Sequence, residues 1–379
     1  MSSVLVFEPR SEGHHVPWAA LITKTLVDAG HRTILAHGPD EDQLARIEAT
    51  QPGVLDSVVR HPIAPDGRPT GRSAMEALAR AVETHDPDRI LVANLDEFAP
   101  STFRRACLGH RLPPSLRGRL RGIYIRPRPL DPGQGGLRVA LMRMGLVRLA
   151  RRGEIERLGV LDENLVASGR DFGIPLEWIP DFWTPAPAID RNEARRRLGV
   201  PDDATALLFF GVPHRRKGLD LVATAMKSRA PERAFLLVAG RQRDDPKLRQ
   251  ALSRLEEQGR AIVHDRYLSD HEMAEAFEAC DRVLLPYRAH YGSSGVLSQA
   301  AAHGRPVVAS DHHLLGRRVR EGGLGVVHRD GDAESLSHAI RESVDADPEH
   351  EAAWHRGLKR WRTRTTQAAF GEAILRLVD

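Results

Sequence analysis

One short apolar strand runs into the stretch Phe210-Gly211-Val212-Pro213-His214-Arg215-Arg216-Lys217-Gly218. Another is followed by the stretch Tyr291-Gly292-Ser293-Ser294-Gly295-Val296-Leu297. The first loop offers cationic side chains. The second offers glycine amides at the start of a small-residue helix that ends at Gly304-Arg305-Pro306. Strand, loop and helix in this order indicate a parallel sheet with helices on its faces. Loops at the carboxyl ends of such strands face a ligand, and cations beside helix amides favour a diphosphate.

Candidate strands and helices alternate outward from this stretch in both directions. Around it, strands are predicted at 206–210, 235–239, 261–263, 282–286, 306–309 and 325–327. In the first half they are predicted at 4–7, 33–36, 90–93, 122–125 and 176–179. The pattern breaks from Ile179 to Pro187, where three prolines fall within eight residues and neither a helix nor a central strand can continue. We therefore expect two doubly wound domains joined by this linker.

Composition excludes several classes of protein. The net charge of the 379 residues is only +4, so no global field favours nucleic acid, and fifty of the 55 basic residues are arginine, as a GC-rich genome gives. Cys107 and Cys280 lie far apart and suit a reduced compartment better than a disulfide or a zinc site. We expect the first residues to form a core strand and not a signal peptide, and no apolar run approaches the ~20 residues of a membrane span. The expected location is the cytoplasm.

Each loop alone has a plainer interpretation. A basic turn is often a solvated surface, and a glycine–serine turn is often an ordinary helix cap. Two such loops after two strands of one sheet are more specific, because arginine grips two phosphate oxygens while lysine acts as a mobile charge. The paired His312-His313 is more typical of a polar surface than of a metal site.

Residues 200–345 resemble the donor half of glycosyltransferase family 4, whose fold is GT-B. The resemblance rests on the basic loop ending Lys217-Gly218-Leu219-Asp220, the strand Leu236-Leu237-Val238-Ala239-Gly240, and the turn Arg266-Tyr267-Leu268-Ser269-Asp270. Strand 282–286 and Gly304-Arg305-Pro306 follow in the family's order. Residues 1–180 are similar only in the glycine loop at Gly13-His14-His15.

The resemblance implies an α/β protein of the GT-B fold, with two Rossmann-like doubly wound domains facing a central cleft. We expect an N-terminal acceptor domain at 1–183 and a C-terminal nucleotide-sugar donor domain at 184–353. A C-terminal helix within 354–379 is expected to pack back on the N-terminal domain. The implied activity is transfer of a sugar from a nucleotide-diphosphate sugar to an acceptor.

The resemblance also implies roles for individual residues. Lys217 and Arg216 would neutralise the departing diphosphate, the turn at Tyr267 and Leu268 would hold the nucleobase, and the amides after Tyr291 would meet sugar and phosphates. The implied donor-binding residues are Gly211, His214, Arg215, Arg216, Lys217, Tyr267, Leu268, Tyr291, Gly292, Ser293, Ser294, Gly295 and Gln299.

The chain departs from the family pattern at three positions. Tyr291 and Gln299 stand where the family places two glutamates, and Val212 stands where an arginine is common. Gln299 retains donor and acceptor atoms for ribose hydroxyls, whereas Tyr291 cannot replace a carboxylate at the sugar. Two alternatives therefore stay open: a GT-B nucleotide-sugar epimerase or atypical bond-forming transferase, and a catalytically silent nucleotide-binding protein.

The expected chemistry needs no metal and no cofactor besides the nucleotide sugar as co-substrate. Fixed cations and helix amides can stabilise the leaving diphosphate, and no acidic cluster in the sequence suggests a divalent ion. The resemblance implies retention of configuration at the anomeric carbon.

Polar residues after two N-terminal strands are candidates for the acceptor side. Gly13, His14 and His15 follow the first strand, and Asp96 follows strand 90–93. Glu12 and His14 are the residues placed to orient or deprotonate an acceptor hydroxyl. A helix entry with exposed polar residues would look the same. The acceptor itself stays unidentified: a small molecule, a saccharide or a lipid-linked compound.

Residues 104–152 form the most basic segment, with thirteen arginines and Asp131 as their one acidic residue. Helix 137–152 would place Met144 beside Arg143 and Arg151, which suits peripheral contact with an anionic membrane or a phosphorylated acceptor. A solvent face over the domain core is the plainer alternative. Only Tyr124 adds an aromatic ring, so no nucleic-acid partner is expected.

Overall fold

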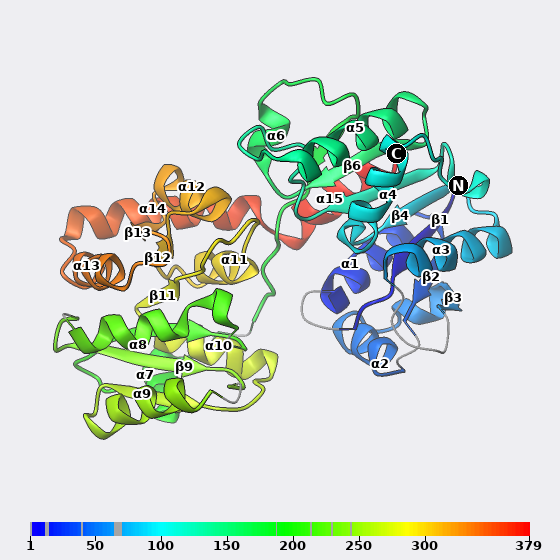
Figure 1. The fold of residues 1–379 in the computed structure, drawn as a ribbon. Coiled ribbons are helices and arrows are strands. Elements are labelled where there is room, and N and C mark those ends of the chain that lie inside the picture. The colour runs from blue at the N-terminus through cyan, green and yellow to red at the C-terminus, as the bar shows by residue number, and fades with distance from the viewer. Residues whose placement is uncertain are drawn as a thin grey trace. The chain divides into compact units, whose positions relative to one another are not determined.

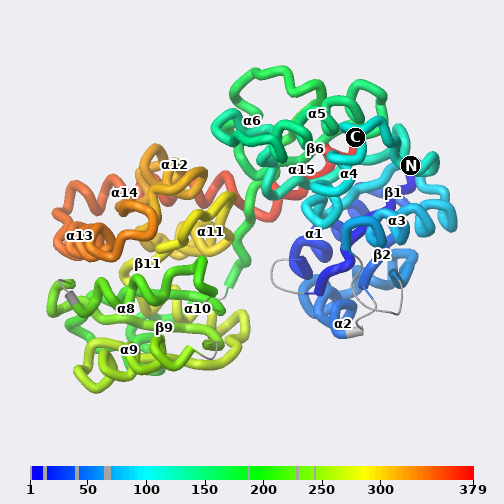
Figure 2. Tube along the Cα trace, viewed as in Figure 1, coloured from blue at the N-terminus to red at the C-terminus, as the bar shows by residue number. Residues whose placement is uncertain are grey.

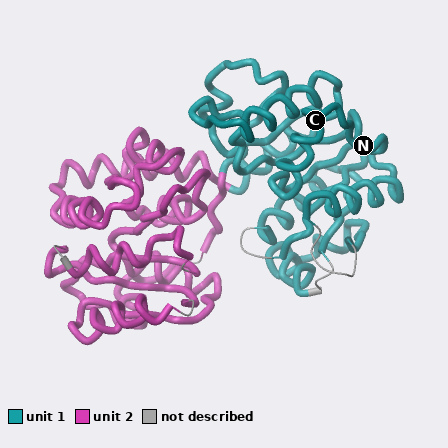
Figure 3. The backbone as a smooth tube through the Cα atoms, viewed as in Figure 1, with its two compact units in different colours: residues 1–180, 367–379 teal, residues 181–366 magenta. Residues whose placement is uncertain are grey.

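The chain forms two compact units. This computed structural model describes residues 2–11, 15–38, 41–63, 70–186, 188–212, 214–228, 230–242 and 245–379. Unit 1 comprises Met1–Pro180 with Gln367–Asp379, and unit 2 comprises Asp181–Thr366 (Figure 3). Each has its own sheet and its own hydrophobic core. Among the described residues, every helix is too short or too polar to cross a bilayer.

The described part of unit 1 holds a seven-stranded sheet in the order β3-β2-β1-β4-β5-β6-β7, with all pairs parallel (Figures 1 and 2). The strands are β1 (Ser3–Glu8), β2 (Arg32–His37), β3 (Val59–Pro62), β4 (Arg89–Val92), β5 (Leu120–Tyr124), β6 (Ile155–Val160) and β7 (Leu176–Trp178). The helices are α1 (His15–Asp28), α2 (Glu41–Thr50), α3 (Gly71–His85), α4 (Ala99–Cys107), α5 (Leu137–Arg151), α6 (Glu163–Ala167) and α15 (Gln367–Val378), with 3-10 turns η1 (Val54–Ser57), η2 (Leu95–Glu97) and η3 (Pro114–Leu116).

The described part of unit 2 holds a six-stranded parallel sheet in the order β10-β9-β8-β11-β12-β13. The strands are β8 (Thr205–Phe210), β9 (Ala234–Ala239), β10 (Ala261–His264), β11 (Arg282–Leu285), β12 (Val307–Ser310) and β13 (Gly325–His328). The helices are α7 (Arg191–Leu198), α8 (Leu219–Ser228), α9 (Pro246–Glu257), α10 (Asp270–Ala279), α11 (Gly295–Ala302), α12 (His313–Gly322), α13 (Ala333–Val344) and α14 (Pro348–Arg364), with the 3-10 turn η4 (Arg215–Lys217).

The doubly wound class follows from how strand residues divide between two cores. Along β8, Leu208 lies in one hydrophobic cluster of unit 2, while Leu207 and Phe209 lie in another. Successive side chains of a strand point to opposite faces, so both faces of the sheet are buried under helices. The predicted α/β, doubly wound class is confirmed.

Eleven strands were predicted and all are present, within one or two residues at each end. The prediction omitted β3 and β6. Strand β3 is largely exposed at the sheet edge and carries arginine, histidine and proline, so it lacks the apolar run that marked the others. Strand β6 mixes Glu156 and Arg157 with apolar residues.

The C-terminal segment divides between the units. The units separate after Pro180, three residues before the predicted boundary, and Asp181 and Trp183 belong to unit 2. We expected a C-terminal helix of 354–379 to pack back on the N-terminal domain. Residues 354–366 belong to unit 2, where Trp361 joins its core. Only α15 returns to unit 1, where the Phe370 ring meets the Trp18 ring edge-on at 5.3 Å. The prolines of the linker predict where one domain ends, but they do not show which hydrophobic core the apolar face of each C-terminal helix packs against.

Candidate functional site

Two loops of unit 2 leave the carboxyl ends of neighbouring strands. Strands β8 and β11 pair directly, with Leu207 opposite Arg282. The loop after β8 carries Gly211 and the 3-10 turn η4 before α8, and the loop after β11 leads to α11. Parallel pairing therefore brings the predicted basic loop and the predicted glycine–serine turn to one edge of the sheet.

Hydrogen bonds tie the two loops together. The Arg288 amide donates to the Arg216 carbonyl at 2.7 Å, and the Arg288 guanidinium donates to the Arg215 carbonyl at 3.0 Å. That guanidinium also meets both carboxylate oxygens of Asp220, at 2.7 and 2.6 Å. Sequence reasoning missed Arg288. Its only signal was a cation shortly after strand β11.

The Arg216 side chain is held by a histidine of the other loop. Its guanidinium contacts Nδ1 of His290, and the opposite ring nitrogen lies 2.7 Å from the Ser293 carbonyl oxygen. A neutral His290 with its proton on Nε2 satisfies both contacts, since it accepts at Nδ1 and donates at Nε2. The loop that presents the helix start thereby orients the cation of the basic loop.

Lys217 is a half-buried cation beside the end of β8. Its Nζ lies 3.4 Å from the Phe210 carbonyl oxygen and 5.7 Å from the centre of the Tyr287 ring. Among the described residues it has no carboxylate partner. A half-buried ammonium without a counterion attracts an anion strongly, because protein surroundings screen it less than water does. His214 and Arg215 are exposed on the same turn.

Glycines let the backbones of this region pack closely. Gly218 has φ 75°, and a Cβ atom there would collide with the Pro286 carbonyl at the end of β11. A Cβ at Gly240, the residue after β9, would lie 2.8 Å from the Gly211 carbonyl oxygen. A side chain at Gly218 would push the loops after β8 and β11 apart, and one at Gly240 would push apart the segments that follow β8 and β9.

The start of α11 is open toward the same edge. Ser294 is the extended N-cap residue, and within the described structure its side chain makes no cap hydrogen bond. A Cβ placed on Gly295 would meet no described atom within 4 Å. The first-turn amides of a helix lack partners within the helix and carry its positive end, so this opening suits an anion.

Tyr291 and His313 form an aromatic pair beside this opening. Their ring centroids are 4.9 Å apart, and His313 is one of the non-glycine residues with positive φ, at 50°. Ala289, with φ 44°, donates its amide to Asp330 at 2.9 Å. Backbone strain of this kind persists where the surroundings impose it, and it is common at functional sites. His312 and His313, expected on a plain polar surface, are thus half-buried, and His313 contacts the candidate site residue Tyr291.

Gln299 has an available acceptor atom. It lies half-buried on α11, and its Oε1 is buried without a hydrogen-bond partner among the described residues. Buried polar atoms without partners are rare, and a ligand hydroxyl would satisfy this one.

Known proteins are similar to this part of the chain. Residues 204–345 match the family model described as glycosyl transferases group 1. A D-inositol 3-phosphate glycosyltransferase of Stackebrandtia nassauensis is 32% identical over 180 residues, covering 45% of this chain and 40% of the relative. One from Catenulispora acidiphila is 32% identical over 170 residues, or 42% and 40% of the two chains. The chain thus spans about 40% of the length of these curated relatives.

Over residues 204–345, unit 2 is similar to the glycosyl transferases of group 1.

Solved structures extend the likeness of the fold to the whole chain. HepE of Anabaena, in complex with UDP and glucose, aligns with a TM-score of 0.71 and 15% identity over 99% of each chain. Sucrose-phosphate synthase from Thermosynechococcus elongatus aligns with a TM-score of 0.67 and 17% identity, over 100% of this chain and 98% of the other. The chain has the GT-B fold, as the sequence resemblance implied.

In unit 2, Tyr267 and Leu268 lie after β10, at the end of the sheet. Tyr267 is 70% exposed, and the Arg241 guanidinium lies 5.6 Å from its ring centre. A 2.6 Å ion pair between Arg266 and Glu272 fixes the turn. Strand β10 is two strands from β8, about 10 Å at ordinary strand spacing. Arg241 was not predicted, although it directly follows an apolar strand that ends in glycine.

The candidate acceptor residues in unit 1 are only partly described. Glu12, Gly13 and His14 lie outside the described residues. His15 begins α1 and is buried, with Nδ1 2.9 Å from a carboxylate oxygen of Glu8, the last residue of β1. Glu8 was not predicted, although a carboxylate ending an apolar strand would be placed at the ligand edge.

A second carboxylate stands at the end of β4, the neighbour of β1. Asp96 accepts hydrogen bonds from the amides of Ile125 at 2.9 Å and Arg126 at 3.3 Å. Burial raises the pKa of Asp96 to about 6 against the opposing charge of Arg126. Beside it, Glu97 forms an ion pair with Arg10, whose guanidinium also lies 3.4 Å from Nε2 of His15. The structure therefore brings His15 and Asp96 to one edge of the sheet of unit 1.

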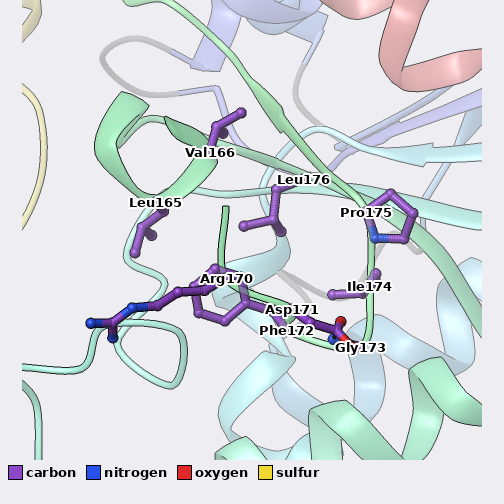
Figure 4. A pocket seen from close by; sticks show the side chains of 9 residues that line it. All are labelled: Leu165, Val166, Arg170, Asp171, Phe172, Gly173, Ile174, Pro175 and Leu176. Atoms are coloured by element: carbon purple, nitrogen blue, oxygen red, sulfur yellow. Dashed lines mark hydrogen bonds between the residues drawn. The ribbon is translucent and has the colours of Figure 1, made fainter. Parts of the chain in front are cut away.

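A separate hollow of about 480 Å³ opens in unit 1 (Figure 4). Val166, Phe172 and Leu176 line the space together with polar groups that include Asp171, and Arg170 extends outward. It contains none of the predicted donor or acceptor residues. Among the described residues, no three acidic, cysteine or histidine side chains gather as metal ligands would.

Proposed function

We propose that this protein transfers a sugar from a nucleotide-diphosphate sugar to an acceptor hydroxyl, with unit 2 binding the donor. The observation that carries the proposal is Lys217, a half-buried cation without a carboxylate partner among the described residues, on a loop bonded to the one that opens α11. The solved relative with UDP and glucose supports a donor of this class.

In this proposal the diphosphate binds between the basic turn and the start of α11. Lys217 and Arg216 stabilise the negative charge that grows as the sugar–phosphate bond breaks, with His214 and Arg215 nearby. Gly211 leaves room for the Lys217 ammonium, and the amides of the Gly292–Gly295 loop face the phosphates and the sugar. Because these groups are already in place, the transition state gains their stabilisation without reorganisation.

The rest of the donor extends over neighbouring elements. The turn at Tyr267 and Leu268 takes the nucleobase, with Arg241 beside the exposed ring. Oε1 of Gln299, which has no hydrogen-bond partner among the described residues, accepts a hydrogen bond from a hydroxyl group of the nucleotide sugar. Tyr291 borders the sugar. We further propose that transfer retains the anomeric configuration and requires no divalent metal.

Unit 1 supplies the acceptor side in this proposal. Glu12, Gly13 and His14 precede α1, and His15 and Asp96 stand at the ends of β1 and β4. Glu12 or His14 orients the acceptor hydroxyl and takes its proton. The curated relatives are named for D-inositol 3-phosphate, so a phosphorylated polyol is a first compound to test as acceptor.

Calorimetric titration tests donor binding. We expect UDP, GDP or ADP to bind wild-type protein with a Kd that weakens at least tenfold in Lys217→Ala. Release of nucleotide from UDP-glucose or GDP-mannose, with a panel of polyols and saccharides and with EDTA present, then tests transfer. Absence of binding by all three nucleotides would remove the basis of the proposal.

A second candidate function rests on Tyr291. This ring packs on His313 where the family pattern places a carboxylate, so the sugar pocket differs from that of an ordinary transferase. An epimerase or a silent nucleotide-binding protein fits the same diphosphate site. Analysis of the donor after incubation without acceptor separates the three. An altered sugar indicates an epimerase, an intact donor under every acceptor indicates a silent binder, and a glycoside product indicates the transferase.

A further inference from the structure

The outer face of helices α4 and α5 in unit 1 is built on a tight helix pair. Gly145 of α5 packs against the Phe103 carbonyl of α4, where a Cβ atom would collide. The Arg148 guanidinium donates to the Cys107 carbonyl at 2.6 Å, and the Cys107 and Met144 sulfur atoms are 3.5 Å apart. Backbone contact of this kind makes the two helices one rigid platform.

Large apolar side chains stand exposed on this platform. Leu108, just after α4, is 78% exposed, and Leu137 and Met144 of α5 are 77% and 51% exposed. Residues 137, 144 and 151 are seven apart, so they lie along one side of α5 at intervals of about 10 Å. Three of the few large apolar residues that the described structure leaves exposed therefore gather on one helix pair.

Unpaired arginines surround these apolar residues. Arg104 and Arg105 of α4 and Arg151 of α5 are exposed, and none has an ion pair among the described residues. The neighbouring acid Glu154 is buried and already pairs with Arg111 at 2.7 Å. The face is thus cationic and apolar at once.

The apolar surface continues beside α5. Val147, one turn after Met144, lies 3.6 Å from the position that a Cβ on Gly173 would take. Gly173 lines the hollow of Figure 4, whose rim includes Val166 at 37% exposure. The half-buried Val147 therefore connects the helix pair with the loop that lines this hollow.

We propose that the outer face of α4 and α5, defined by Arg104, Arg105, Leu108, Leu137, Met144 and Arg151, docks on an anionic lipid bilayer. The leucines and the methionine enter the boundary between headgroups and acyl chains, and the arginines pair with lipid phosphates. A nucleic acid would match the arginines alone and would leave the leucines in water. The proposal is independent of donor binding.

Vesicle sedimentation tests the docking. Full-length protein is spun with phosphatidylcholine vesicles that contain or lack phosphatidylglycerol, at low and high salt. The test variants are the double variant L137N/M144N and the triple variant R104Q/R105Q/R151Q. The matched control is R196Q/R254Q/R320Q, which removes the same charge from exposed positions of unit 2. Melting curves check that every variant folds.

We expect wild type to sediment with the anionic vesicles only, and less at high salt. The arginine variant should bind at least tenfold more weakly, since each arginine near an anionic surface strengthens binding about fivefold. The apolar variant should also lose binding at low salt. The proposal is overturned if the wild-type protein does not bind anionic vesicles or binds neutral vesicles equally well. It is also overturned if the control variant loses as much vesicle binding as R104Q/R105Q/R151Q.

Discussion

The carbonyl oxygen of Arg216 accepts a 2.7 Å hydrogen bond from the amide of Arg288, joining residues of two loops that follow different strands. The basic turn is therefore fixed by the same loop that opens α11. The Arg288 guanidinium strengthens this connection through both oxygens of Asp220. The spacing between cations and helix amides is consequently set by backbone bonds before any ligand arrives.

Replacing Arg288 by alanine should loosen the basic turn. We expect nucleoside-diphosphate affinity to fall about tenfold, while unfolding free energy changes by about 1 kcal/mol, because both partners of the ion pair with Asp220 are partly exposed to solvent. Arg233→Ala is the control, since it breaks a more exposed ion pair with Asp345 elsewhere in unit 2. Equal nucleoside-diphosphate affinity in Arg288→Ala and wild type would contradict the proposed role of Arg288 in holding the basic turn.

Lys217→Ala should impair the chemical step more than the fold. The loss of one pre-organised cation is expected to lower kcat by about 10²-fold, with the melting temperature unchanged. Lys227→Ala, an exposed lysine in the last turn of the following helix, should behave as wild type. Steady-state kinetics of both variants measures this difference. Similar kcat values for the two variants would contradict the proposed role of Lys217 in stabilising the leaving diphosphate.

Gly218→Ala should destabilise unit 2. Both Gly218 and Gly259 have positive φ, at 75° and 66°, so alanine at either costs about 1 kcal/mol of backbone strain. Only at Gly218 would the new methyl collide with the Pro286 carbonyl, and we expect about 2 kcal/mol more there. Urea unfolding of the two variants isolates the collision. Equal losses would show that the loops do not pack as described.

Stability should fall as pH drops below the ordinary histidine pKa near 6.5. Burial lowers the pKa of His37, and burial followed by the charges of His85 and His37 lowers the pKa of His61. The folded state then binds fewer protons than the unfolded state in this range, so unfolding free energy rises with pH. Urea midpoints at successive pH values should show this slope, and His61→Asn should flatten it. A slope unchanged in that variant would assign the effect to other groups.

Asp96 should give an activity profile with an inflection near pH 6. Burial raises the pKa of Asp96 to about 6, so the carboxyl group is protonated below that pH and charged above it. If Asp96 contacts the acceptor, kcat/KM for acceptor should change across this pH, and Asp96→Asn should remove the inflection. Nucleotide affinity in unit 1 variants should stay at the wild-type value. An inflection that survives in Asp96→Asn would exclude this residue as its source.

The two loops of the candidate donor site could be placed together from sequence because their residues lie in two short segments. Lys217 and Gly218 follow one apolar strand, and the Gly292–Gly295 loop follows another, so the βα pattern alone placed them at one sheet edge. Arg288 and His290 escaped prediction because isolated polar residues in a loop carry no pattern. Glu8 was not predicted as a site residue because its position in the sequence indicates only the end of a strand.

Local sequence by itself determined the alternation of strands and helices, since apolar runs and glycine turns act over a few residues. It also determined the parallel class, because each strand is followed by a helix. Only the tertiary structure decided that Arg288 bonds the basic turn, that Tyr291 meets His313, and that the C-terminal helices divide between units. Those contacts depend on the order of strands in each sheet and on which core each helix packs against. Neither is determined by residues that are neighbours in the sequence.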